Sequence, residues 1–204
     1  MHRLVSLARF WHGDVRHRPM TTFLLVPGVW HGGWVWSEVA GLLTMVGHRP
    51  LCLTLTGLAD RIADRFRALV FFDAMIAENG RSAIDLRNAQ TLTHPVEVTA
   101  SLPVPPLLAE VFGLEGAQAQ RVDRLLTSQP WATYTQLISL TGAFESIGRK
   151  HYVRALRYDA AYLDTSYERA AADPSWTTER RDIGHDMMLI DPHWTAQVIL
   201  TTSG

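Results

Sequence analysis

The sequence predicts an α/β protein with a mostly parallel sheet and helices on both faces. Short apolar segments of strand length alternate with segments of helical composition along most of the chain. The first of these segments is continuously apolar and ends at a Pro-Gly turn, which is typical of a buried strand. With 204 residues, 47% of them hydrophobic, the chain can bury a sizeable core.

Composition excludes several classes of function. A net charge of −1 gives no electrostatic footprint for nucleic acid. No apolar run approaches the roughly 20 residues of a membrane span, and the single cysteine, Cys52, fits a reducing compartment. We therefore expect a cytoplasmic protein without nucleic-acid or membrane partners. Met1–Arg18 is basic and lacks the apolar segment of a secretory signal. Its composition resembles that of a transit peptide, but we favour a flexible extension over residues 1–19, upstream of a second start at Met20.

Two strands and a helix are predicted in the first third of the chain. Phe23–Val26 is a buried strand that ends at a Pro-Gly turn. Ser37 is a candidate N-cap for a helix that runs to Val46 and closes at Gly47. Leu51–Leu55 is the second strand, which stops at a Thr-Gly pair.

A third strand follows closely. Ala59–Arg65 has helical composition, and Arg67–Phe72 is a strand that ends at Asp73. Residues 85–146 then carry several prolines and little strand signal, so we expect a cap that is inserted over the sheet. The sheet domain itself would comprise residues 20–84 and 147–204.

The last third returns to the alternation of strands and helices. His151–Leu156 is predicted as a strand, and Tyr162–Ala172 as a helix that ends before an Asp-Pro pair. Thr177–Ile183 is the final strand, and Trp194–Thr201 a C-terminal helix.

Three blocks of sequence carry a family resemblance. They are Pro27–Trp36, with the sequence PGVWHGGWVW, then Leu53–Leu58, with LTLTGL, and Gly184–Leu189, with GHDMML. In this order they resemble the α/β-hydrolase family of plant methylesterases and hydroxynitrile lyases and their bacterial esterase-like relatives. The resemblance extends over nearly all of residues 20–202. It implies an α/β-hydrolase fold with a helical cap insertion.

The resemblance also implies a set of site residues. Val29 matches the residue whose backbone N–H stabilises an oxyanion, and we include its neighbour Trp30 in the same site. His185 matches the catalytic base. His31 matches a histidine of structural type. No metal or organic cofactor is implied.

The acid that orients His185 is left open by the sequence. The family usually places it just after the strand matched by residues 152–156, where Asp159 lies about one residue from the commonest spacing. Asp73 ends the preceding strand, where some α/β-hydrolases carry the acid instead. We rank Asp159 slightly above Asp73, with Asp164 third.

The nucleophile is missing. The family carries it in a Gly-x-Ser-x-Gly elbow between a strand and a helix, and no such motif occurs in this sequence. Ser82 and Ser146 each match half of the pattern, but neither follows a predicted strand and opens a helix. Cys52 lies within a predicted strand, where burial would keep its thiol inert.

The missing unit can be placed in the chain. In the family, a central strand, the elbow and its helix lie between the Leu53–Leu58 block and the strand at Arg67–Phe72. Here only Gly57–Phe66 joins them, which is shorter than the dozen or more residues that a parallel crossover usually needs. Because the loss of a central strand removes apolar surface from both neighbouring layers, we expect reduced stability or self-association.

Three functional hypotheses follow from these observations. The first is an esterase-like protein that has lost its nucleophile and hydrolyses esters little or not at all. The second is a non-catalytic binding module for a small apolar ester or acid. The third is an incomplete gene model of an active esterase or hydroxynitrile-lyase-like enzyme.

Overall fold

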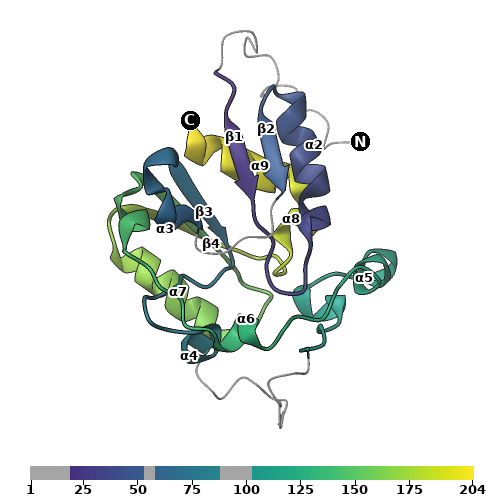
Figure 1. Ribbon diagram of the computed structural model, residues 1–204. Coiled ribbons are helices and arrows are strands. Elements are labelled where there is room, and N and C mark those ends of the chain that lie inside the picture. The colour runs from purple at the N-terminus through teal and green to yellow at the C-terminus, as the bar shows by residue number, and fades with distance from the viewer. Residues whose placement is uncertain (1–18, 53–57, 88–102) are drawn as a thin grey trace.

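The computed structural model describes residues 19–52, 58–87 and 103–204, and within them it has two parallel sheets. One sheet has the order β1-β2 and the other β3-β4-β5, with every pairing parallel (Figure 1). The strands are β1 (Thr22–Leu25), β2 (Arg49–Cys52), β3 (Ala68–Phe72), β4 (Arg149–Ala155) and β5 (Trp176–Arg181). The limits of β1, β3, β4 and β5 differ from the predicted ones by at most two residues. The extension predicted for residues 1–19 lies almost entirely outside the described residues.

The first sheet is built around one helix. A short 3₁₀ turn, η2 (Gly33–Trp36), leads into α2 (Ser37–Met45), and Gly47 adopts a φ of +86° that ends the helix before β2. Ser37 is the first residue of α2 rather than a cap, because its Oγ donates to the Trp34 carbonyl at 2.8 Å. Beyond Cys52, the rest of the strand predicted to reach Leu55 lies outside the described residues.

The short connection to β3 is held by one carboxylate. It consists of α3 (Leu58–Arg61) and η3 (Ala63–Arg65), where the sequence predicts helix. Asp60 accepts from the Thr141 backbone N–H at 2.6 Å and from the Phe144 N–H at 3.3 Å. These bonds attach the connection to the segment that leads into η6 (Ala143–Ser146) and then β4. The connection is therefore fixed to the three-stranded sheet.

Short helices fill the sequence between β3 and β4. They are α4 (Ala83–Arg87), η5 (Ala109–Phe112), α5 (Gly116–Asp123) and α6 (Ala132–Thr135). An isolated antiparallel bridge joins Val104 to Gln129. The division of the chain into a sheet domain and a cap at residues 85–146 stays a prediction.

The second sheet is covered by the C-terminal elements. After β4 comes α7 (Ala161–Ala172), and after β5 come α8 (Met187–Ile190) and α9 (Pro192–Ser203). The Asp191 carboxylate caps α9 by accepting from the Trp194 N–H at 3.1 Å, and Pro192 occupies the first turn, where no N–H is needed.

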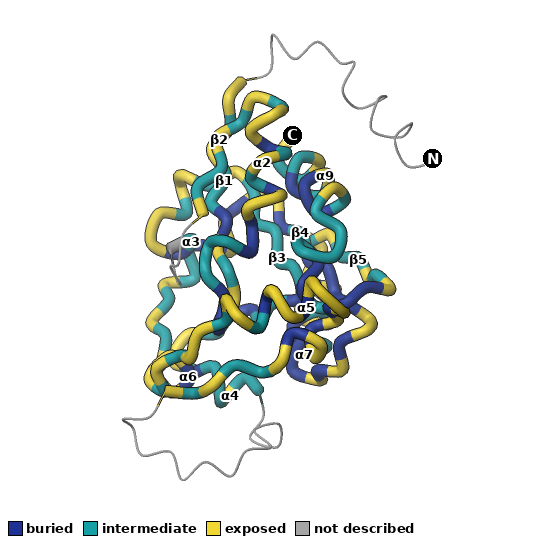
Figure 2. Tube along the Cα trace, turned by 90° about the vertical axis from the view of Figure 1, so that its right-hand side faces the viewer, coloured by how far each residue is buried: buried dark blue, intermediate teal, exposed yellow. Residues whose placement is uncertain are grey.

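One helix joins the two sheets. α9, yellow in Figure 1, packs against α2 and also against β3 and β4. Its Ala196 and Ile199 share a buried apolar cluster with Leu25 of β1, and Phe72 of β3 packs against the same cluster. Buried residues lie in both parts of the molecule (Figure 2). Within the described residues, β1 pairs only with β2, and β3 only with β4, so each sheet has an open edge.

Two further observations concern membrane-spanning helices and metal sites. No helix in the described ranges is long and apolar enough to cross a bilayer. In the same ranges no group of three or more His, Cys, Asp or Glu side chains is arranged to hold a metal ion.

Candidate active site

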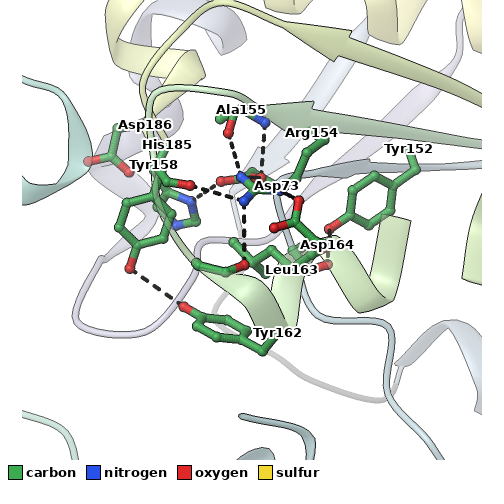
Figure 3. Close-up of polar contacts among 12 residues, drawn as sticks. Asp73, Tyr152, Arg154, Ala155, Tyr158, Tyr162, Leu163, Asp164, His185 and Asp186 are labelled. Carbon is green, nitrogen blue, oxygen red and sulfur yellow. Dashed lines mark hydrogen bonds and ion pairs between the residues drawn. The ribbon is translucent and has the colours of Figure 1, made fainter. Parts of the chain in front are cut away.

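A histidine and an aspartate meet at the carboxyl ends of the strands in the three-stranded sheet. His185 lies in the loop after β5, and Asp73 directly follows β3. The His185 Nδ1 is 2.7 Å from the Asp73 Oδ2 (Figure 3). The Asp73 side chain is completely buried, whereas 25% of the His185 side chain is exposed. This is the arrangement of a general base and the acid that orients it.

The backbone holds Asp73 in a strained position. Its φ of +47° is in the left-handed region, which is uncommon for a residue with a side chain. The Asp73 N–H donates to the Val153 carbonyl at 2.7 Å, and its Oδ1 accepts from the Ala155 N–H at 3.0 Å. Strain of this kind is of the order of 1–3 kcal/mol and persists where the surroundings determine the conformation. Asp73 Oδ2 is thereby aimed at His185.

A buried arginine completes the surroundings of Asp73. Arg154 lies in β4 with 4% of its side chain exposed, and its guanidinium donates to Asp73 Oδ1 at 2.9 Å and to Asp164 Oδ1 at 2.8 Å. It also donates to the carbonyl oxygens of Ala155 and Tyr158 (Figure 3). A guanidinium with this many partners is a rigid fork that fixes the carboxylates around it.

The structure reverses the order in which the sequence ranks the acids. Asp159, ranked first, is exposed, and the carboxylate on His185 belongs to Asp73. The physical reason is Arg154, which binds the Tyr158 carbonyl and draws Asp164 and Asp73 to its guanidinium. An arginine inside a predicted strand is a signal that sequence reasoning missed, since a buried arginine needs a carboxylate partner.

Two aromatic rings lie against the His185 imidazole. The ring centre of Tyr158 is 4.6 Å away and that of Phe112 is 5.7 Å away, both tilted by about 40°. Among the described residues, the Nε2 of His185 has no hydrogen-bond partner. Donation of the Nδ1–H to Asp73 leaves Nε2 as the basic nitrogen.

Two backbone N–H groups of the predicted oxyanion loop are candidate donors to an oxyanion. Trp30 has a φ of +66°, its carbonyl accepts from the Thr127 N–H at 3.1 Å, and its indole donates to the Val104 carbonyl at 3.2 Å. In the described part of the chain the backbone N–H groups of Val29 and Trp30 donate no hydrogen bond. Free N–H groups in a fixed turn are what a developing oxyanion requires.

Two buried side chains connect this loop to the His185 loop. The His31 Nε2 is 3.2 Å from Asp186 Oδ2, and its Nδ1 is 2.9 Å from the Val29 carbonyl oxygen. Asp186 follows His185 directly in the chain. The structure therefore places His31 between the two loops of the candidate site, a position in keeping with the structural type that the resemblance implies.

The close approach of the Gly184 and Gly113 backbones also fixes the His185 loop. A Cβ on Gly184 would lie 2.7 Å from the Phe112 carbonyl oxygen and 2.8 Å from the Gly113 Cα. These distances are too short for any other residue. The loop before His185 therefore needs glycine so that it can lie against the end of η5.

None of the candidate nucleophiles lies at His185. Ser82 is buried and its Oγ donates to Asp85 Oδ2 at 2.7 Å, while the Ser146 Oγ donates to the Ala143 carbonyl at 2.7 Å. Cys52, predicted to be buried, is exposed at the end of β2. Partial desolvation still raises the pKa of its thiol, so the thiolate is disfavoured.

Comparison with known proteins supplies a relative and several structures of the same fold. No protein-family profile matches the chain. A carbendazim-hydrolysing esterase of Nocardioides sp. (strain SG-4G) is 25% identical over 239 residues, which include 87% of this chain and 98% of the esterase. Since the chain has 204 residues, at least 35 positions of that alignment have no counterpart in it.

Solved structures agree on the fold. An extracellular α/β-hydrolase from a Paenibacillus species, described as homologous in structure and function to tobacco salicylic acid binding protein 2, has a TM-score of 0.73 at 16% identity. That match covers 90% of this chain and 99% of the Paenibacillus chain. Tomato methylketone synthase I, solved with β-ketoheptanoate, has a TM-score of 0.69 at 13% identity, and the match covers 90% and 97% of the two chains. The chain therefore has the α/β-hydrolase fold.

Proposed function

We propose that this chain keeps the base and the oxyanion loop of an esterase but lacks its nucleophile, and that it hydrolyses esters little or not at all. One observation carries the proposal. His185 Nε2 has no hydrogen-bond partner among the described residues, and the full sequence contains no Gly-x-Ser-x-Gly motif. A base held on Asp73 with no group to deprotonate cannot start acyl transfer through a covalent intermediate.

Three further observations support the loss of a strand–elbow–helix unit. The sheet is divided between β1 and β3, and each of these strands has an open edge in the described residues. The connection from β2 to β3 contains only one helical turn and a 3₁₀ turn after the undescribed residues 53–57. The alignment with the Nocardioides esterase is also longer than this chain.

The ligand we propose is a small apolar ester or its acid. Phe112 and Tyr158 give the surroundings of His185 an aromatic character, and the N–H groups of Val29 and Trp30 suit a carbonyl oxygen. The similar proteins, a carbendazim-hydrolysing esterase and a synthase solved with β-ketoheptanoate, are in keeping with small carbonyl compounds.

The purified chain is expected to hydrolyse p-nitrophenyl acetate no faster than its His185→Ala variant. A fluorophosphonate probe, which reacts with activated serines, is expected to leave the chain unlabelled in intact-mass spectra. The reason is that no serine of the described residues is hydrogen-bonded to His185. Turnover that depends on His185, or a serine adduct of stoichiometric amount, would refute the proposal.

A thermal scan distinguishes the alternative hypothesis, a non-catalytic binding module, from a chain that neither binds nor hydrolyses esters. A rise in Tm with β-ketoheptanoate or salicylate, in a preparation without esterase turnover, favours binding over catalysis. The His185→Ala variant serves as the comparison, because a ligand seated at the site contacts this side chain.

We also propose that the open edges promote self-association. An exposed strand edge is a template for pairing with another chain, and both β1 and β3 have one in the described residues. Light scattering over a hundredfold range of concentration is expected to give masses above the 22.9 kDa of one chain. A monomer at every concentration contradicts this proposal.

A pair of lysine substitutions locates the interface. Val26 follows β1 directly and is 38% exposed, so Val26→Lys places a charge at the end of the open edge and is expected to reduce the mass. Met45, at the end of α2, is 68% exposed, and Met45→Lys is expected to leave the mass unchanged.

A further inference from the structure

We propose that His31 and Asp186 form a buried ion pair at neutral pH that holds the oxyanion loop against the His185 loop, so that both are positioning residues of the candidate site. The assignment of a site to these loops rests on the proposed function. The charge state of the pair does not, because it follows from contacts that exist whether or not the chain reacts with a substrate.

The hydrogen bonds of His31 require two ring protons. The Nδ1 is 2.9 Å from the Val29 carbonyl oxygen, and the Nε2 is 3.2 Å from Asp186 Oδ2. A carbonyl oxygen and an ionised carboxylate can only accept hydrogen bonds, and a neutral imidazole has a single N–H to donate. His31 satisfies both acceptors only as the imidazolium cation.

The surroundings of the pair contain no competing charge among the described residues. His31 is 6% exposed and Asp186 is 3% exposed. The rings of Trp34, from η2, and Phe112, from η5, also lie against His31, each with its centre 5.7 Å away. Asp186 is the ionised group that faces His31, so the charge of each residue is compensated by the other.

The electrostatics agree with this geometry. Burial lowers the pKa of His31, but the hydrogen bond and the charge of Asp186 outweigh it and raise the pKa above the usual 6.5. While Asp186 is ionised, the pair therefore stabilises the fold fully below the unfolded pKa. This contribution is lost as the pH rises through the raised pKa of folded His31.

The pair can position the site because of where its members lie in the chain. His31 is two residues after Val29, and Asp186 is the residue after His185. The Asp186 backbone N–H also donates to the Phe112 carbonyl at 3.3 Å, so both its side chain and its backbone are held. A shift of either loop would break the ion pair, and the pair thereby fixes Val29 relative to His185.

The test is nitrogen NMR of the full ¹⁵N-labelled chain at pH 7. Long-range ¹H–¹⁵N spectra show which imidazole nitrogens carry protons, and His31 is expected to have both protonated. In Asp186→Asn the amide oxygen can still accept from Nε2, but the negative charge is gone. His31 is then expected to lose one ring proton, with shifts in the His185 ring nitrogens and the Val29 amide.

The matched control is Asp182→Asn, in the same loop after β5. Asp182 binds Arg157 at 2.7 Å and its side chain is 71% exposed, so this variant removes an equal charge without touching the pair. It is expected to leave the His31, His185 and Val29 signals in place.

Two outcomes would overturn the inference, and neither needs an activity assay. A wild-type His31 with one ring proton at pH 7 removes the ion pair, and this result requires no variant to fold. If His31 is doubly protonated in the wild type but the His185 and Val29 signals do not change in Asp186→Asn, the buried ion pair exists but does not position the two loops. Ester turnover tests the proposed function separately.

Discussion

Insertion of a strand, a Gly-x-Ser-x-Gly elbow and a following helix into residues 53–57 is expected to raise hydrolysis of p-nitrophenyl acetate by roughly 10⁴- to 10⁶-fold, the range set by the loss of a catalytic serine or its partners. The gain is large because the other parts are in place. His185 is held on Asp73 at 2.7 Å, and the N–H groups of Val29 and Trp30 make no other bond in the described residues.

The insertion also addresses the divided sheet. A parallel strand between β1 and β3 would pair with both open edges and turn the two sheets into one. The same insertion variant is therefore expected to have a higher Tm and less self-association than the chain of 204 residues. The higher Tm and the reduced self-association require only that the inserted strand pairs with β1 and β3. Turnover also requires the inserted serine to contact His185 Nε2.

Two variants of the insertion separate these effects. Replacement of the inserted serine by alanine keeps the new strand and is expected to abolish turnover while the gain in Tm remains. His185→Ala in the same background is expected to abolish turnover as well. A monomeric, stabilised insertion variant that has the serine and shows no His185-dependent turnover would contradict the proposed function.

The alternation of elements could be predicted from sequence because it depends on local apolar segments. Phe23–Val26 and Arg67–Phe72 are continuously apolar over much of their length and bounded by turn residues, which indicates strands without knowledge of their neighbours. The division of the sheet could not be predicted in this way. It depends on which strands are adjacent, which involves residues far apart in the chain, such as those of α9, which packs against α2 in one part and against β3 and β4 in the other.

The candidate site, like the fold, could be predicted only where it depends on local sequence. The Gly-His-Asp sequence indicates His185, since the glycine permits the close approach to Phe112 and Gly113. The choice of Asp73 over Asp159 depends on Arg154, whose contacts reach across β3, β4 and α7. The link between His31 and Asp186 joins residues 155 positions apart, and no local pattern shows it.

The second large effect concerns stability. Arg154→Met is expected to lower the free energy of unfolding by roughly 3–5 kcal/mol, as measured by urea denaturation at pH 7, because it leaves the buried Asp73 without its cation. The Asp73 side chain is 0% exposed and cannot be hydrated in place. Asp164 is 45% exposed and can turn to water, so the penalty falls mainly on Asp73.

Arg157→Met is the matched control, three residues along the chain. Arg157 also forms an ion pair, with Asp182 at 2.7 Å, but the two side chains are 64% and 71% exposed. Exposed pairs contribute about 0–1 kcal/mol, so this variant is expected to unfold at nearly the wild-type urea concentration. Equal losses in the two variants would contradict a special role for the buried arginine.

A double variant decides whether the loss in Arg154→Met is one of charge or of packing. Asp73→Asn removes the buried negative charge, so Arg154→Met combined with Asp73→Asn is expected to lose clearly less stability than the sum of the two single changes. Additive losses would mean that Arg154 acts through its packing in β4 alone. A large coupling would instead show that the cation at Arg154 is what allows a charged aspartate to lie buried next to His185.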